Sequence, residues 1–541
     1  MLRMCKLAWL PIVLAMLVVA SQPAVAQEPV VVISTKSADG LISDAKYVLG
    51  AGGQPELGNL IDGMIDQFTQ GKGLQGIERT KPLGAYMSIA AAGTPDFVVF
   101  IPVNDIKAFR DLLATYLPQQ QEVAGGTFSL QGQDQQIYGK YQNGYCYLTL
   151  LPAALSKLPD PAKFVTNKTY ALSLEADIGK LPNEVKEQLL ETIENAVAAP
   201  DEGAPPADDV QARIQARAQK MTLQMFRMLV KETDRLSLGI EVDQKSKVLA
   251  VDVNVRARTG TPLAQSLAGY AKTTGAFAAL GGPEAAMNFS FAAPVADELR
   301  DLMRDAFRAG FDQARAGIDS SEKLQTPEQK KVAKDLIDRV TKVIEATGDT
   351  GKIDAAVVMN TVSADKVQVV AAAKIAKGDE LAKVIDDFVK QNPNDPGLKK
   401  LKRDVAKHGG ARIHELAVEL EGDAKQNLGD GPIHLAIRDD AVYFAIGGDS
   451  LAAVKAAIDN TGKPAANRPP ISIRMRPSKL IAVFAKDEDE QTKLARESFK
   501  GDGDHISLEL LPAERGARLR LEFGEGFLRF IGALAGQQLG G

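Results

Sequence analysis

The histidines are the first residues to consider as metal ligands or general bases. The sequence contains four, His408, His414, His434 and His505, and no two have the His-x-x-x-His spacing that brings two zinc ligands to one face of a helix. We predict His414 and His434 on neighbouring strands, where they could approach each other. Because histidines on strands commonly face solvent, we predict no metal site.

Two short segments are rich in acidic residues, 486–490 and 501–505. A calcium loop needs further oxygen ligands at fixed offsets, but the apolar Ile506 and Leu508 stand where such a loop keeps polar groups. We interpret the first segment as a solvated helix start, where acids suit the helix dipole, and the second as a Gly-rich turn.

Nucleophile and phosphate motifs indicate no catalytic site either. Cys146 stands between two tyrosines in an apparent strand, without the nearby base or helix start that lowers the pKa of a thiol, so we predict a small buried hydrophobic residue. The chain has no Gly-x-Ser-x-Gly elbow, phosphate loop or dinucleotide fingerprint. We therefore predict no catalytic residue, no cofactor and no enzyme.

One apolar stretch is a candidate ligand contact. Met221, Met225, Phe226 and Met228 lie within a helix predicted at 210–233. Flexible methionine side chains accept apolar ligands of varied shape, whereas apolar stripes at helical spacing most often belong to the core. Both interpretations stay open for this helix.

The first 26 residues have the layout of a secretory signal peptide. Arg3 and Lys6 precede an apolar run at 7–20, and the small residues at 24–26 predict cleavage before Gln27. An uncleaved anchor is the alternative, but the run is shorter than the roughly 20 residues that span a bilayer. We expect an exported protein, periplasmic or extracellular, with no transmembrane span after signal removal.

Composition restricts the mature chain further. Without the signal peptide Cys146 is its single cysteine, so we expect no intramolecular disulfide. The hydrophobic fraction of 45% and the charged fraction of 25% are ordinary for globular proteins. The net charge of −5, with both signs mixed, lacks the basic footprint of proteins that bind nucleic acid.

A cycle of elements recurs along the chain and determines the predicted fold. Short apolar or alternating strands that run into helices are predicted at 30–33, 170–174, 287–291 and 471–475. Hairpins followed by helices are predicted at 84–103, 236–255, 353–373 and 506–523. We predict an α+β fold in which repeated strand-helix and hairpin-helix units form antiparallel sheets covered by helices on one face, rather than a doubly wound parallel sheet.

Matching inserts indicate two similar halves. Extra strands followed by a short helix are predicted after 127 and again after 412, with Asp449 and Ser450 as the N-cap of the second helix. We predict a signal peptide at 1–26, a first α+β half at 27–272 with a flexible insert near 198–209, and a second α+β half at 273–541.

The segment at 73–84, Gly-Leu-Gln-Gly-Ile-Glu-Arg-Thr-Lys-Pro-Leu-Gly, resembles a pattern in large exported proteins of unknown function from planctomycete-type bacteria. The resemblance covers the signal peptide and the first cycle of elements best, about a third of the chain. It implies nothing about activity, and no functional residue carries over from it.

These observations predict an exported non-enzymatic binding or structural protein of the periplasm or cell envelope. Its partner would be another envelope protein or an apolar small molecule, and no nucleic acid. A carrier of an apolar ligand such as a lipid is the first alternative, and an unrecognised hydrolase is the second.

Overall fold

The computed structural model describes residues 28–539, except 90–94, 118, 133–134, 199–208, 283, 296, 321–325, 392–399, 465–468, 486–488 and 502. The predicted signal peptide and most of the predicted insert near 198–209 lie outside these residues. Within the described part of the chain, no helix combines the length and apolar character needed to cross a membrane.

The strands form one continuous antiparallel sheet of twenty strands. From one edge to the middle, hydrogen-bonded neighbours follow each other in the order β4 (Gln120–Val123), β5 (Thr127–Gln131), β6 (Gln136–Gln142), β7 (Tyr145–Thr149), β3 (Pro95–Pro102), β2 (Leu83–Ile89), β1 (Val31–Thr35), β8 (Leu172–Ala176), β9 (Thr233–Asp243) and β10 (Val248–Ala257). From the middle to the other edge, the order is β20 (Gly516–Gly524), β19 (Ile506–Ala513), β18 (Ile471–Met475), β11 (Met287–Pro294), β12 (Lys352–Thr361), β13 (Val367–Lys374), β17 (Ala441–Ile446), β16 (Ile433–Arg438), β15 (Ala411–Leu416) and β14 (Leu401–His408).

The two sides of the sheet have the same strand order. They meet where β10 pairs with β20. At each step outward from this junction, the strand on one side has a number ten higher than the strand on the other, from β9 and β19 to β4 and β14. The prediction of an α+β fold with antiparallel strands is confirmed, and the strands belong to one sheet.

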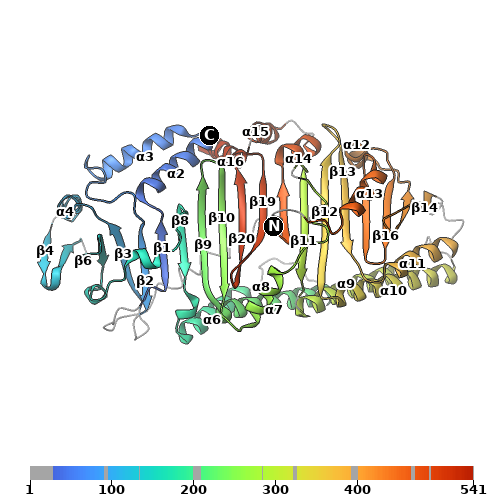
Figure 1. Ribbon diagram of the computed structural model, residues 1–541, viewed down its shortest axis with the longest axis horizontal. Coiled ribbons are helices and arrows are strands. Elements are labelled where there is room, and N and C mark those ends of the chain that lie inside the picture. The colour runs from blue at the N-terminus through green and yellow to red at the C-terminus, as the bar shows by residue number, and fades with distance from the viewer. Residues whose placement is uncertain are drawn as a thin grey trace.

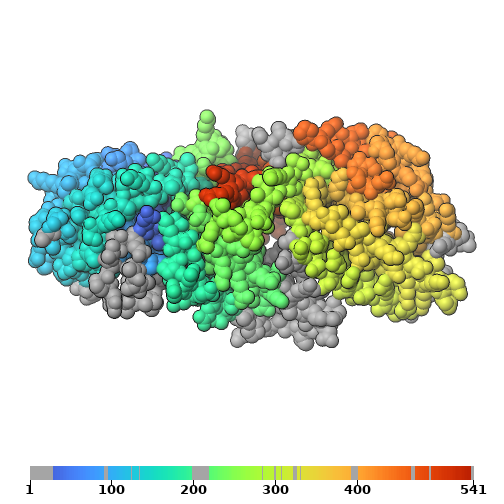
Figure 2. Space-filling model, turned by 60° about the horizontal axis from the view of Figure 1, so that its bottom comes forward, coloured from blue at the N-terminus to red at the C-terminus, as the bar shows by residue number. Residues whose placement is uncertain are grey.

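Helices line both ends of the strands. Figure 1 shows the strands upright, with α2, α3, α14, α15 and α16 along their upper ends and α6 to α10 along their lower ends. The helices are α2 (Ala38–Ala51), α3 (Pro55–Phe68), α4 (Ile106–Ala114), α5 (Pro161–Phe164), α6 (Asn183–Ala198), α7 (Asp209–Glu232), α8 (Pro262–Ala271), α9 (Asp297–Ser320), α10 (Pro327–Asp349), α11 (Gly378–Gln391), α12 (Gly422–Leu428), α13 (Ser450–Asn460), α14 (Pro477–Phe484), α15 (Glu490–Ser498) and α16 (Glu525–Leu539), with 3-10 helices η3 (Ala124–Gly126), η4 (Pro152–Leu155) and η5 (Ile178–Lys180). The space-filling view shows the elongated body, with the N-terminal part of the chain at one end (Figure 2).

The most deeply buried core clusters lie toward the two ends of the sheet. At the β3–β7 end, Tyr147 and Leu155 of η4 belong to one buried cluster, and Cys146 and Phe109 of α4 belong to another. Because Cys146 and Tyr147 are successive residues of β7, they point to opposite faces, so this end is covered on both faces. At the other end, Tyr443 of β17 packs with α13.

Local sequence chemistry accounts for several boundaries. The predicted N-cap of α13 is present, because Asp449 accepts a hydrogen bond from the backbone N–H of Ala452 at 2.9 Å. The turn at Asn143-Gly144 has φ of 56° and 76°, which these two residue types tolerate, and it joins β6 to β7.

Candidate functional site

One face of the sheet carries three rows of apolar side chains across its middle. Residues that lie directly opposite each other on antiparallel strands share a face, so the strand registers define each row. We call these rows the apolar face. They are Leu174, Leu238, Val253, Leu519, Leu510, Ile471, Phe291 and Ala355; Leu172, Ile240, Val251, Leu521, Leu508, Ile473, Phe289 and Val357; and Val242, Leu249, Phe523, Ile506, Met475, Met287 and Met359. No row contains a charged or hydrogen-bonding polar side chain.

The apolar face is partly open to solvent. Every side chain of the first two rows is half-buried or exposed, and none is buried. Leu172 is 43% exposed and Leu519 is 38% exposed, and on the same face farther along Ile33 and Val99 are 43% and 42% exposed. Scattered surface leucines are ordinary, whereas contiguous apolar rows left open make this face a candidate binding surface.

Three methionines lie side by side on this face. Met287 of β11 lies directly opposite Met475 of β18 on one side and Met359 of β12 on the other. All three are half-buried. Unbranched thioether side chains adapt to ligands of different shape, so this part of the face is its most adaptable.

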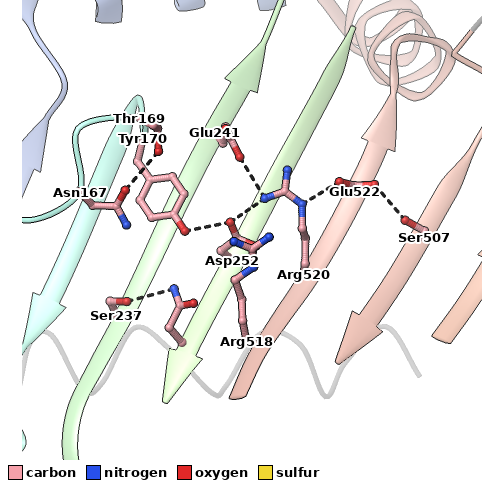
Figure 3. A network of polar contacts seen from close by, with 11 residues as sticks. Asn167, Thr169, Tyr170, Ser237, Glu241, Asp252, Ser507, Arg518, Arg520 and Glu522 are labelled. Carbon is pink, nitrogen blue, oxygen red and sulfur yellow. Dashed lines mark hydrogen bonds and ion pairs between the residues drawn. The ribbon is translucent and has the colours of Figure 1, made fainter. Parts of the chain in front are cut away.

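The opposite face is polar and charged at the same strands. Figure 3 shows Arg520 of β20 at the centre of a network that reaches across β9, β10, β20 and β19. Its guanidinium donates to Asp252 at 2.8 Å and to Glu241 at 2.9 Å through Nη1, and to Glu522 at 2.7 Å through Nε. Ser507 donates to Glu522 at 3.3 Å. Although burial opposes it, this contact with carboxylates raises the pKa of Arg520, so Arg520 is a permanent cation that joins the two sides of the sheet.

Asp252 is the buried centre of the network. It has no exposed surface, and its Oδ2 accepts hydrogen bonds from Tyr170 and Arg520, both at 2.8 Å. The ring of Tyr170 lies over Gly239, where an added Cβ would come within 2.1 Å of the ring. Burial raises the pKa of Tyr170, so its hydroxyl remains a donor. The open hollow above these residues, about 660 Å³, is lined almost entirely by polar groups.

The predicted contacts on α7 lie elsewhere in the fold. Met225 is 48% exposed, whereas Met221, Phe226 and Met228 are half-buried. Helix α7 packs against α6, α8 and α9. These four residues do not belong to the rows of the apolar face, and a role for them in ligand contact stays a prediction. The apolar face has its own methionines, which local sequence reasoning missed because they come from three separate strands.

The two strand histidines do lie on paired strands, but on opposite faces. His434 lies directly opposite Glu415, whereas His414 lies opposite Leu435. Because neighbouring positions along a strand alternate between faces, the two imidazoles point away from each other. The described residues contain no group of three or more His, Cys, Asp or Glu side chains that could hold a metal ion.

A serine, a histidine and a glutamate lie in line near α13. His434 Nδ1 is 2.7 Å from the hydroxyl of Ser450, and His434 Nε2 is 3.6 Å from Glu415. This order of groups is that of a hydrolase triad. Ser450, however, is 2% exposed and donates its proton to the carbonyl of Pro432 at 2.7 Å, so it is not placed to attack a substrate. Burial lowers the pKa of His434, which keeps the ring neutral.

No protein-family model matches this chain, and neither a curated protein nor a solved structure matches it. The site must therefore be interpreted from its own geometry.

Proposed function

We propose that the protein is an exported binding protein of the periplasm or cell envelope that carries an apolar ligand, such as the acyl chain of a lipid, on the apolar face. The observation that carries this proposal is the set of directly registered apolar rows whose side chains are left half-buried or exposed. Export rests on the signal-peptide pattern of residues 1–26.

The chemistry of the rows favours an apolar chain over a protein partner. Protein interfaces carry about one hydrogen bond per 100–200 Å². The rows offer no polar side chain, and the backbone N–H and C=O groups of these strands are paired with each other inside the sheet. A partner with polar groups would leave them without hydrogen bonds, which costs about 1–3 kcal/mol for each buried group. A hydrocarbon chain carries no such groups.

The available apolar surface is large enough to hold such a ligand. Fully burying a leucine or isoleucine side chain is worth about 1.5–3 kcal/mol, so covering a side chain that is 43% exposed, such as Leu172 or Ile33, gains about 0.6–1.2 kcal/mol. The four exposed side chains on this face, Leu172, Leu519, Ile33 and Val99, together gain about 2.5–5 kcal/mol. The half-buried side chains of the rows add to this, which brings micromolar affinity, about −8 kcal/mol, within reach.

The test combines native mass spectrometry with a matched pair of variants. The chain starting at Gln27 is purified without detergent, and any bound mass is extracted and identified. Binding of a fluorescent fatty acid is then compared between the Leu172→Gln/Leu519→Gln double variant and Leu151→Gln. Leu151 is 44% exposed but lies outside the rows, so it controls for the loss of one exposed leucine.

A lipid mass on the native chain, with fatty-acid binding weakened about tenfold in the double variant and unchanged in Leu151→Gln, supports the proposal. A bare monomer mass and no fatty-acid binding would refute it. A defined multimer or a bound protein would instead favour a structural role with an envelope protein as partner.

We further infer that the two sides of the sheet arose as two copies of one ten-strand unit. The identical strand order from β10 to β4 and from β20 to β14 supports this inference, as does the pair of helices between β1 and β2 and between β11 and β12. On this inference, the halves predicted at 27–272 and 273–541 would correspond to the two copies.

A further inference from the structure

A separate cavity of about 770 Å³ lies in the second half of the chain. Four segments that are distant in sequence meet there: the loop 273–278 before β11, the end of α10 with the start of β12, the end of β13 with the β16–β17 turn, and the loop after α13. Its volume is that of a typical small-molecule site. It is independent of the apolar face, because Asp354 and Ala356 of β12 point to the face opposite Ala355 and Val357.

The wall of this cavity is held in place by specific contacts. Asp354 is buried, and both of its carboxylate oxygens accept a hydrogen bond from the backbone N–H of Ala276, at 2.9 and 3.1 Å. The carbonyl of Ala276 accepts in turn from the N–H of Gly462 at 2.7 Å. The loop at 273–278 is thus fixed to β12 on one side and to the segment after α13 on the other.

The charged groups around the cavity are mainly basic. Lys352, Lys374 and Lys463 line it, against two carboxylates, Asp354 and Asp440. Lys352 lies 3.3 Å from Asp354 and donates to the carbonyl of Thr274 at 3.2 Å, and Lys374 contacts Asp440.

A fourth cation increases the excess of positive charge around the cavity. Arg438 also pairs with Asp440, at 2.5 and 3.2 Å, so Lys352, Lys374 and Arg438 contact the two carboxylates, while Lys463 donates to the side-chain oxygen of Asn460 at 3.2 Å. Both carboxylates are therefore neutralised, and a positive charge remains at the cavity.

The equivalent strand positions in the first half carry larger side chains. Tyr147 on β7 and Tyr443 on β17 occupy the same step of the strand order, and Phe100 lies opposite Tyr147 where Ala372 lies opposite Tyr443. In the first half Phe164 packs edge-on against Phe100, with ring centroids 5.4 Å apart.

The next position along the same strand differs in charge as well. This is the next residue on the same face, two positions beyond Phe100 and Ala372, and it is Pro102 in the first half and Lys374 in the second. At these two positions the second half therefore has alanine and lysine where the first half has phenylalanine and proline.

We propose that this cavity binds a small organic anion. A carboxylate or phosphate group would lie against Lys352 and Lys374, which each have ammonium hydrogens beyond those used for their carboxylate partners. The apolar part of the ligand would lie against Ala276, Ile375 and Pro464 on the cavity wall.

The experiment is isothermal titration of the mature chain with three probes of one shape. Phenyl phosphate and benzoate carry the two candidate anionic groups, and benzyl alcohol is the neutral comparison. The variant is Lys352→Gln/Lys374→Gln. The control is Lys400→Gln/Lys46→Gln, because Lys400 and Lys46 are 44% and 37% exposed and each pairs with a carboxylate, as the cavity lysines do at 42% and 34%.

The expected result is binding of one or both anions, at least tenfold weaker in the cavity variant and unchanged in the control, with no binding of benzyl alcohol. Preference for phenyl phosphate or for benzoate identifies the anionic group. A second variant, Ala278→Phe, keeps every charge but occupies the space and should also abolish binding. Absence of anion binding up to about 10 mM, or equal weakening in the control, overturns the proposal.

Discussion

Replacing Asp252 with alanine is expected to loosen the junction between the two sides of the sheet. Asp252 has no exposed surface and accepts hydrogen bonds from Tyr170 and Arg520, both at 2.8 Å. Removing one partner of a buried ion pair costs about 3–5 kcal/mol. Arg520 keeps Glu241 and Glu522 as partners, which places the expected loss at the lower end, about 3 kcal/mol.

Hydrogen exchange measured by mass spectrometry reports this loss strand by strand. A local opening free energy lowered by about 3 kcal/mol accelerates exchange roughly 100-fold, and the peptides that contain β9, β10 and β20 should show it. Peptides from β5 and β15, far from the junction, should not change. The control is Asp62→Ala, because Asp62 pairs with Lys46 at 2.6 Å but is 62% exposed, and exposed pairs contribute about 0–1 kcal/mol. Unchanged exchange at β10 in Asp252→Ala, or the same acceleration in Asp62→Ala, would show that the buried Asp252 contacts do not stabilise the junction.

Three further predictions follow from single residues. Burial raises the pKa of Cys146 to about 12, so iodoacetamide at pH 8 should leave the native chain unmodified and alkylate it only after denaturation. Burial lowers the pKa of His434 in the folded chain, so the unfolded chain takes up the proton first as the pH falls. The contribution of His434 to the free energy of unfolding should therefore be greatest above about pH 6.5 and decrease as the pH drops below it. Denaturant titrations between pH 7 and pH 5 should show a weaker pH dependence in His434→Asn. Gly239→Ala should displace the Tyr170 ring and accelerate exchange of β10 as Asp252→Ala does; normal exchange in that variant would show that the ring can shift without cost.

Strong local patterns made most of the fold predictable. The strands that run into helices show such a pattern, as in Ile471 to Met475, where apolar residues alternate with polar ones and the predicted bounds match the observed strand. The edge strands β4 and β14 were missed, because Leu401–His408 is mostly exposed and polar and has no alternation. Lysines on an exposed edge strand commonly prevent it from pairing with another chain. Because charged residues then replace apolar ones, the strand lacks the alternation of apolar and polar residues by which strands are predicted.

The candidate site was much less predictable than its strands. The apolar face joins Leu172, Ile240, Val251 and Leu521, and the pairing of β10 with β20 brings residues together that no local pattern connects. The available signal was that strands from both halves place apolar residues at every second position. That signal predicts an apolar side for each strand, but it does not show that the sides align or that helices leave them open.

Because the strands follow one another in a single linear order, the stability of the sheet depends mainly on contacts between neighbouring strands. Each strand is hydrogen-bonded to at most two neighbours, so the two edges of the sheet are connected only through all the strands between them. As in solenoid proteins, stability is then close to a sum of nearest-neighbour contacts, and unfolding can begin at one edge and travel inward. Unfolding that begins at β14 would therefore involve β4 last, and the edge strands should be able to separate while the centre of the sheet stays folded.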